Sequence, residues 1–250
     1  MTFNDTLRWL EWLAIATLLA AAFFIAFPDL DLDVSLRFGD VSGFHLSESR
    51  VLNLARSGML WLCNGPIAVV LFIAIVSVFV RRARLFKTRA LLFILTTYAV
   101  VPGILVNGLL KRNSGRARPR NIEEFGGDAV FTPVLRYADQ CEINCSFVSA
   151  EASAIFTVAI LAITVFVPSL TKAMQSPVRL LFLMIAIVGS FLRVPFGAHF
   201  ISDVVFAALF SSMAVMSLYS VFGMHRIGSP FLRVSSRTEY EAFSRQSHTI

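Results

Sequence analysis

Long apolar runs constrain the fold of this 250-residue chain more than any other feature of its sequence. The hydrocarbon core of a bilayer is about 30 Å thick, and a helix needs roughly 20 apolar residues to cross it. Six runs are long enough: residues 9–27, 59–80, 90–110, 150–167, 180–197 and 201–222. The sequence therefore predicts an all-α membrane protein, folded as a bundle of six transmembrane helices.

Composition leaves little room for a separate soluble domain. Charged residues make up only 15% of the chain, against about 25% in an average soluble protein. We expect one six-span membrane domain over residues 1–224. The remaining residues, 225–250, are polar, rich in Ser and Arg and without helical periodicity, which is typical of a flexible tail.

The positive charges predict which side of the membrane each loop faces. Between the second and third runs lie five basic residues and no acid: Arg81, Arg82, Arg84, Lys87 and Arg89. Such loops stay in the cytoplasm, so this loop and the tail should be cytoplasmic, and the segments after the first, third and fifth runs external. The external segment after the third run nevertheless carries six basic residues: Lys111, Arg112, Arg116, Arg118, Arg120 and Arg136. Positive charge on the side that the rule disfavours indicates that this segment binds an anion.

The three cysteines agree with this orientation. Cys63 lies inside the second run, where a small buried residue is expected. Cys141 and Cys145 share the long external segment, and an oxidising environment there favours a disulfide between them over two free thiols. A metal site would need further Cys or His ligands close by, and the segment contains none, so we expect no metal there.

The stretch Arg193-Val-Pro-Phe-Gly-Ala-His199-Phe-Ile-Ser-Asp203 contains the groups of a nucleophilic phosphoryl-transfer site. His199 and Asp203 are four residues apart, so on a helix they would share a face. The carboxylate would hold one ring nitrogen and leave the other free to attack phosphorus. Arg193 would hold the phosphate oxygens through its planar guanidinium group. The simpler interpretation is a histidine at the membrane interface beside a helix-start aspartate.

A second stretch, Lys111-Arg-Asn-Ser-Gly-Arg-Ala-Arg118-Pro119, follows the third run. Basic residues beside a span are ordinarily anchors or topology signals, so this stretch alone is weak evidence. The two stretches together are more informative, because both lie on the same predicted face of the membrane. They predict a site for a phosphorylated substrate at that surface.

These stretches resemble the type 2 phosphatidic acid phosphatase (PAP2) superfamily, whose signatures are Lys-x6-Arg-Pro, Pro-Ser-Gly-His and Ser-Arg-x5-His-x3-Asp. Lys111, Arg118 and Pro119 match the first signature. The two matched signatures span the third to sixth runs, and the six-span layout extends the resemblance to the whole chain.

The third signature is matched by Arg193, His199 and Asp203, with Leu192 where the family usually has Ser. The resemblance implies that His199 is the nucleophile and becomes phosphorylated, with Asp203 as its partner. It also implies that Arg193, together with the Lys and Arg of the first signature, holds the phosphate of the substrate. No metal or other cofactor is implied.

The middle signature is where this chain departs from the family. Aligned on Ser149, Val148 replaces Pro, Ala150 replaces Gly and Glu151 replaces His. Ser149 lies at a predicted helix start, where its hydroxyl and the free backbone N–H groups would bind phosphate. Its alternative role is that of a plain helix N-cap.

Glu151 raises the question of the general acid, because the family's His at this position is assigned to protonating the leaving alcohol. A glutamic acid can do so only if it holds a proton near neutral pH. The alternatives are His45, which shares the external side with His199, or a substrate whose leaving group needs little help. A lipid phosphate leaving a diphosphate and an anomeric sugar hydroxyl are such leaving groups.

The resemblance implies a lipid phosphate phosphatase in a bacterial inner membrane, with its site facing the periplasm. The Ser-Phe-Val-Ser-x-Glu variant is similar to Gram-negative members that remove phosphates from lipid A, which is the favoured substrate. Undecaprenyl diphosphate and phosphatidylglycerophosphate are the alternatives. A catalytically silent lipid-binding or transport protein is a further possibility, but such a protein would have no reason to keep the nucleophile. Nothing in the sequence indicates a nucleic acid or protein partner.

Overall fold

The computed structural model describes residues 2–80, 85–227 and 229–231. Within these ranges the chain consists of helices and irregular loops, and its only β-pairing is in isolated bridges. Six helical segments are long and apolar enough to cross a membrane: Phe3–Ala26, Arg50–Phe79, Thr88–Asn113, Ala150–Ser169, Lys172–Phe191 and Ile201–Val221. The prediction of an all-α membrane protein with six spans is confirmed.

Four of the spans are single α-helices: α1 (Phe3–Ala26), α3 (Arg50–Phe79), α7 (Lys172–Phe191) and α8 (Ile201–Val221). The third span is composite, and its parts are α4 (Thr88–Tyr98), a π-helical stretch (Ala99–Leu110) and α5 (Lys111–Asn113). The fourth consists of α6 (Ala150–Leu161), a π-helical turn (Ala162–Phe166) and a 3₁₀ turn (Val167–Ser169). The short helix α2 (Leu30–Ser35) lies between α1 and α3. Further 3₁₀ turns cover His45–Glu48, Pro119–Asn121, Glu123–Phe125 and Met224–Arg226.

The fifth span differs most from its predicted range, because it ends at Phe191 and not at residue 197. Beyond Phe191 the chain forms turns instead of a helix, and Gly197 has a left-handed backbone (φ 59°) that residues with a side chain disfavour. The Phe44 ring packs against this glycine so closely that an added Cβ would lie 2.2 Å from it. Arg193 therefore lies on a loop, close to the start of the sixth span.

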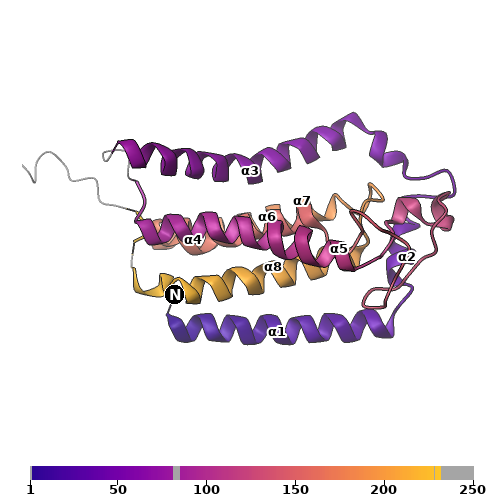
Figure 1. The fold of residues 1–250 in the computed structure, drawn as a ribbon, viewed down its shortest axis with the longest axis horizontal. Coiled ribbons are helices and arrows are strands. Elements are labelled where there is room, and N and C mark those ends of the chain that lie inside the picture. Colours follow the sequence, from indigo (N-terminus) through magenta and orange to yellow (C-terminus); the bar gives the residue numbers. More distant parts are fainter. Residues whose placement is uncertain (1, 81–84, 228, 232–250) are drawn as a thin grey trace, which may run out of the picture.

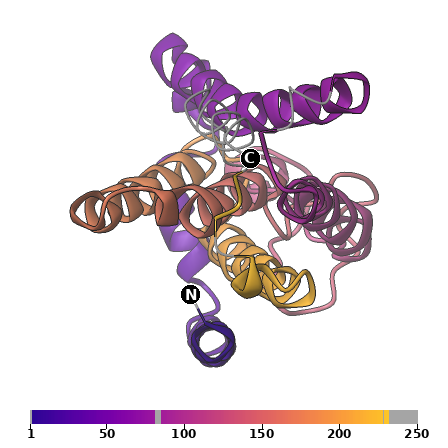
Figure 2. The same cartoon turned by 90° about the vertical axis from the view of Figure 1, so that its left-hand side faces the viewer.

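The helices run side by side along the length of the molecule (Figure 1). Seen end-on, α1 and α3 lie on opposite sides of the bundle (Figure 2). α6 packs against α8, α7 and the π-helical stretch of the third span, which makes it the central helix. Only 6% of the apolar stretch of each of α1 and α3 is buried inside the bundle, as expected of helices that face lipid. The candidate active site is built around the N-terminal end of α6.

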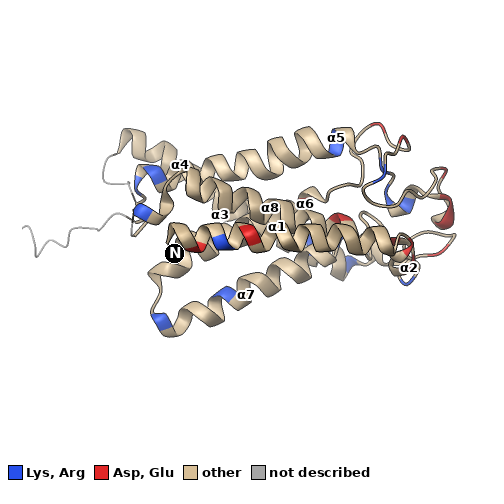
Figure 3. Cartoon of the chain, turned by 90° about the horizontal axis from the view of Figure 1, so that it is seen from below, with Lys and Arg blue, Asp and Glu red and all other residues tan. Residues whose placement is uncertain are grey.

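The segments that follow the first, third and fifth spans gather at one end of the bundle, beside α2 (Figure 1). Most Asp and Glu residues are at this end, whereas Lys and Arg occur at both ends (Figure 3). At the opposite end Lys87 donates a hydrogen bond to the carbonyl oxygen of Ile227 at 2.7 Å. The 85–89 segment and the start of the tail therefore share a side, as the charge pattern predicts.

A disulfide joins Cys141 and Cys145, as favoured from the sequence, and Cys63 is free and buried. The predicted flexible tail, 225–250, falls mostly on residues 228 and 232–250, which lie outside the described residues.

Candidate active site

A polar cavity of about 550 Å³ opens at the end of the bundle that carries α2. Five of the predicted site residues line it: Lys111, Arg118, Glu151, Arg193 and His199. The other two, Ser149 and Asp203, are fully buried and do not appear in its wall. The structure thus brings together residues from the third span, the loop that follows it, the fourth span and the loop before the sixth span.

His199 is not on a helix, so the expectation that it shares a helical face with Asp203 is wrong. α8 begins at Ile201, and Phe200 is its N-cap. The Asp203 carboxylate folds back over the start of the helix and accepts the backbone N–H of Phe200 at 2.9 Å. This cap brings Asp203 Oδ2 to 3.6 Å from His199 Nδ1. The four-residue spacing therefore places Asp203 beside His199 through helix capping, and not through a shared helical face.

The backbone of Ser146 determines the tautomer of His199. His199 Nδ1 lies 2.8 Å from the Ser146 carbonyl oxygen, and a carbonyl can only accept, so Nδ1 carries the hydrogen. The Nε2 lone pair is then available as a nucleophile. The Ser146 hydroxyl donates to Asp203 Oδ2 at 2.5 Å. Ser146 thereby links the histidine to the carboxylate, a role that no pattern in the sequence had indicated.

Burial keeps the His199 ring neutral at physiological pH. Its side chain is 2% exposed, and desolvation lowers the pKa of His199 to about 4, with Lys111 and Arg193 acting in the same direction against Asp203. A neutral imidazole is the form that attacks phosphorus. Burial also lowers the pKa of Arg193, to about 10, so this side chain remains charged at neutral pH.

Asn144 orients two of the predicted phosphate-binding cations. Lys111 Nζ donates to its side-chain oxygen at 3.0 Å. Arg118 donates from Nε and one Nη to its backbone oxygen at 3.0 and 2.9 Å. Asn144 has a left-handed backbone (φ 57°), which Asn adopts more readily than most residues, and it lies inside the disulfide loop. Lys111 and Arg118 are thus held in place while still facing the cavity.

Glu151 is held by two guanidinium groups. Arg56, on α3, donates from Nε at 3.0 Å and from Nη2 at 2.6 Å to its two oxygens. Arg193 Nη1 lies 3.3 Å from Glu151 Oε2. Both carboxylate oxygens are therefore occupied by charged donors, which favours the ionised form. Arg56 precedes the predicted start of the second span, and its charge beside that run was the only available signal of its role.

Arg193 retains an unused donor. Its Nε is buried and has no hydrogen-bond partner among the described residues. Buried donors are almost always paired, and a bound anion would satisfy this one.

Ser149 and His45, which were also proposed to contribute, do not line the cavity. The Ser149 hydroxyl accepts the backbone N–H of Ala152 at 3.3 Å, so it acts as the N-cap of α6. His45 is exposed, with its Nε2 3.1 Å from Ser42 Oγ and 3.7 Å from Asp40 Oδ2. It is absent from the cavity wall. Among the described residues, no cluster of three or more His, Cys, Asp or Glu side chains is placed to hold a metal ion.

Two curated relatives are similar to this chain over most of its length. The chain is 30% identical over 209 residues to the lipid A 4'-phosphatase of Francisella tularensis subsp. novicida, covering 80% of this chain and 89% of that protein. It is 29% identical over 232 residues to the lipid A 4'-phosphatase of Rhizobium leguminosarum, covering 86% and 94%.

A solved structure shares the fold. It is the transmembrane PAP2 type phosphatidylglycerolphosphate phosphatase from Bacillus subtilis, with a TM-score of 0.57 at 20% identity, covering 87% of this chain and 98% of that one. The sequence profile of the PAP2 superfamily matches residues 89–227, which include all seven predicted site residues. On this match and on its curated relatives, the chain belongs to the PAP2 superfamily.

Proposed function

We propose that this membrane phosphatase removes a phosphate group from lipid A, through a phosphohistidine formed on His199. The observation that carries the proposal is a buried, neutral histidine in the wall of a cavity that also presents Lys111, Arg118 and Arg193. The curated relatives are named lipid A 4'-phosphatases, which favours lipid A among phosphorylated lipids.

In the proposed reaction, His199 Nε2 attacks phosphorus while the three cations hold the non-bridging oxygens. The bond between phosphorus and the sugar oxygen breaks, and that oxygen leaves as the alcohol after taking a proton. Positive charge develops on the imidazole and is stabilised by Asp203, which acts through the hydroxyl and carbonyl of Ser146. Water then cleaves the phosphorus–nitrogen bond, which releases inorganic phosphate and returns His199 to its neutral form.

Glu151 is our proposed proton donor for the leaving oxygen. Sugar alkoxides are poor leaving groups, so a positioned acid is valuable. Of the described residues in the cavity wall, Glu151 is the one carboxyl group. To act, it must exchange an Arg56 contact for a proton. A bound phosphate promotes this exchange, because it draws Arg193 away from Glu151 and disfavours a second negative charge nearby.

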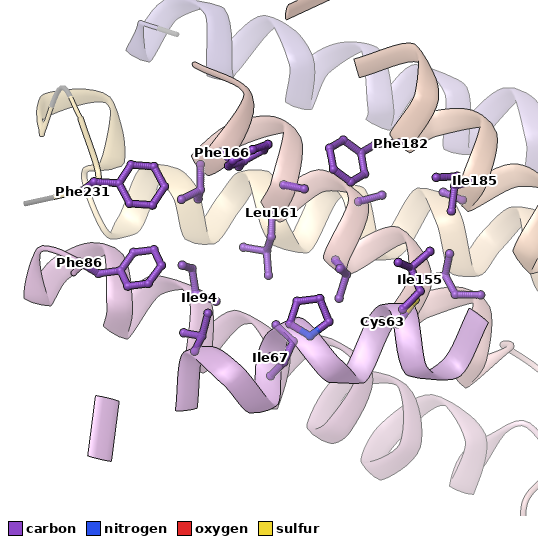
Figure 4. Close-up of a pocket in the computed structure, with 18 residues that line it drawn as sticks. Cys63, Ile67, Phe86, Ile94, Ile155, Leu161, Phe166, Phe182, Ile185 and Phe231 are labelled. Atoms are coloured by element: carbon purple, nitrogen blue, oxygen red, sulfur yellow. The ribbon is translucent and has the colours of Figure 1, made fainter. Parts of the chain in front are cut away.

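A second cavity supports a lipid as the substrate. It has a volume of about 350 Å³ and lies between α3, α4, α6 and α7, where apolar side chains such as Ile67, Ile155 and Phe182 surround it (Figure 4). Arg56 of the polar site is about two helical turns from Cys63 in this cavity, and Glu151 is about one turn from Ile155. An acyl chain can therefore enter this apolar space while its phosphorylated headgroup occupies the polar cavity.

We further propose that the site faces the periplasm of a bacterial inner membrane. The basic 81–89 segment supports this orientation, because such segments remain cytoplasmic. Its described part, 85–89, leads into α4 at the end of the bundle away from α2 (Figure 3), whereas the polar cavity opens at the α2 end.

The test is phosphate release by purified protein in detergent without added metal, from lipid A, undecaprenyl diphosphate and phosphatidylglycerophosphate. Mass spectrometry of the lipid product then identifies which phosphate has been lost. We expect the highest kcat/KM on lipid A and no turnover by His199→Ala. Hydrolysis of either other lipid with lipid A left intact would refute the proposed substrate.

A further inference from the structure

Arg116 lies inside the first signature, at a position that the signature leaves open, and its side chain is 3% exposed. It is absent from the cavity wall, so it does not face the substrate. Its Nη1 donates to Asp203 Oδ1 at 2.7 Å and its Nη2 to Asp31 Oδ2 at 2.8 Å. Its Nε donates to the backbone oxygen of Thr132 at 2.9 Å. The guanidinium group is thus fixed by three segments of the chain.

Asp31, on α2, holds the same network from its far side. It is 1% exposed, and its Oδ1 accepts the backbone N–H of Ser202 at 2.9 Å. Its Oδ2 accepts the Ser202 hydroxyl at 2.5 Å. One arginine therefore lies between two buried carboxylates, and the second carboxylate comes from the external segment after α1.

Arg116 also contacts Ser146, the residue that links the catalytic pair. Its backbone oxygen accepts the N–H of Ser146 at 2.8 Å. Its side chain occupies Asp203 Oδ1, which leaves Oδ2 for the Ser146 hydroxyl and the Phe200 N–H. The Asp203 carboxylate and Ser146 both lie behind His199, and their position and orientation therefore depend on Arg116.

We propose that Arg116, held by Asp31, is a positioning residue for His199, distinct from the three cations that bind phosphate. It acts through Asp203 and Ser146 and not on the substrate. This inference rests on the proposed function, since it assigns Arg116 to the phosphohistidine step.

The expected kinetic signature is a loss of kcat with little change in KM. In Arg116→Lys the ammonium keeps the charge, but it has no planar fork to reach Asp203, Asp31 and Thr132 together. Outer hydrogen-bond partners of metal-bound histidines typically contribute 10–100-fold. By analogy we expect kcat to fall by roughly that factor, and KM to change by less than about twofold. A phosphate-binding cation behaves differently, and Arg118→Gln should raise KM. Arg112→Lys, an exposed arginine on α5, is the matched control and should keep wild-type kinetics.

A pH profile separates positioning from a merely structural role. The charged groups that act on His199 are Asp203, which favours its protonated form, and Lys111 and Arg193, which oppose it. The Arg116 cation offsets the negative charge of Asp203, so removing it should raise the pKa of His199. The acid limb of kcat/KM should therefore move to higher pH in Arg116→Gln. In Asp31→Asn a negative charge is lost instead, so the limb should not move upward.

Nitrogen NMR of the labelled imidazole gives a readout that does not require turnover. The wild-type protein should show a neutral ring with its hydrogen on Nδ1 at pH 7, and Arg116→Gln should raise the midpoint at which His199 takes up a second proton. If the wild type released no phosphate from any substrate, the proposed function would fail, and this spectrum would still decide the positioning role.

Should the Arg116 variants fail to fold, Asp31→Asn decides, because it keeps the shape and the Ser202 N–H contact while weakening the hold on Arg116. A folded Asp31→Asn protein with wild-type kcat would overturn the inference. So would a folded Arg116→Gln protein with an unmoved acid limb and an unmoved imidazole midpoint.

Discussion

Replacing Glu151 with glutamine tests the most unusual feature of this site. The substitution keeps the shape of the side chain and one oxygen for Arg56, but it removes the ionisable group and the negative charge that Arg56 and Arg193 share. Two roles are then distinguishable. As a proton donor, Glu151 matters in proportion to the basicity of the leaving group. As a partner for the two arginines, it matters equally for every substrate.

The magnitudes of the two effects differ. A positioned general acid typically contributes 10²–10⁴-fold, which corresponds to about 2.7–5.4 kcal/mol of barrier at 1.36 kcal/mol per tenfold. Hydrogen bonds to charged groups contribute roughly 1.5–3 kcal/mol when buried. The side chains of Arg56 and Glu151 are 35% and 23% exposed, so solvent screens their interaction. The free energy lost when this ion pair is broken should therefore lie near or below the lower end of that range of roughly 1.5–3 kcal/mol.

The assay compares lipid A with an aryl phosphate, whose leaving group needs no proton. If Glu151 is the acid, Glu151→Gln should lose 10²–10⁴-fold in kcat on lipid A while barely changing on the aryl phosphate. Arg56→Gln is the matched control, because it breaks the same ion pair and leaves the carboxyl group intact.

If Glu151→Gln changed kcat by the same factor, relative to wild type, on lipid A and on the aryl phosphate, the proton-donor role would be refuted. Glu151 would then be the residue that orients Arg193. The same selective loss in His45→Ala would transfer the role to His45, against its exposed position beside Asp40.

The remaining predictions concern the nucleophile, the orientation and the disulfide. His199→Ala should abolish turnover while membrane insertion, checked by fractionation, is unchanged, and Asp203→Asn should lose activity nearly as fully. Wild-type turnover in purified His199→Ala would exclude the phosphohistidine. Because the nucleophile must be neutral and burial lowers the pKa of His199 to about 4, kcat/KM should stay level as the pH falls towards that value and drop below it; an acid limb near the ordinary histidine value would contradict this. Reporter fusions after Arg84 and after Asp128 should give cytoplasmic and periplasmic signals respectively, and the reverse pattern would invert the orientation. Thiol labelling of denatured, unreduced protein should modify Cys63 alone, since the other two cysteines form the disulfide; three labelled cysteines would contradict that pairing.

The sequence by itself determined the setting and most of the site. Six spans could be predicted because the length of an apolar run is a local property of the sequence, and the thickness of the bilayer sets the length that a span needs. Lys111, Arg118, Arg193 and His199 could be identified because two signatures fix their types and spacings, and the structure places all four around one cavity. The Cys141–Cys145 pair followed from short spacing and an expected external location.

Tertiary structure alone decided how these groups are held. Arg56 reaches Glu151 across 95 positions of the chain, and Arg116 reaches Asp203 across 87. Nothing in the sequence distinguishes Asp31 from the other acids of its segment until α2 packs against the start of α8. The tautomer of His199 depends on a backbone carbonyl 53 positions away, which no side-chain pattern encodes. Spans and signatures are local and can be read along the chain, whereas buried charges find their partners only when distant segments fold together and exclude water.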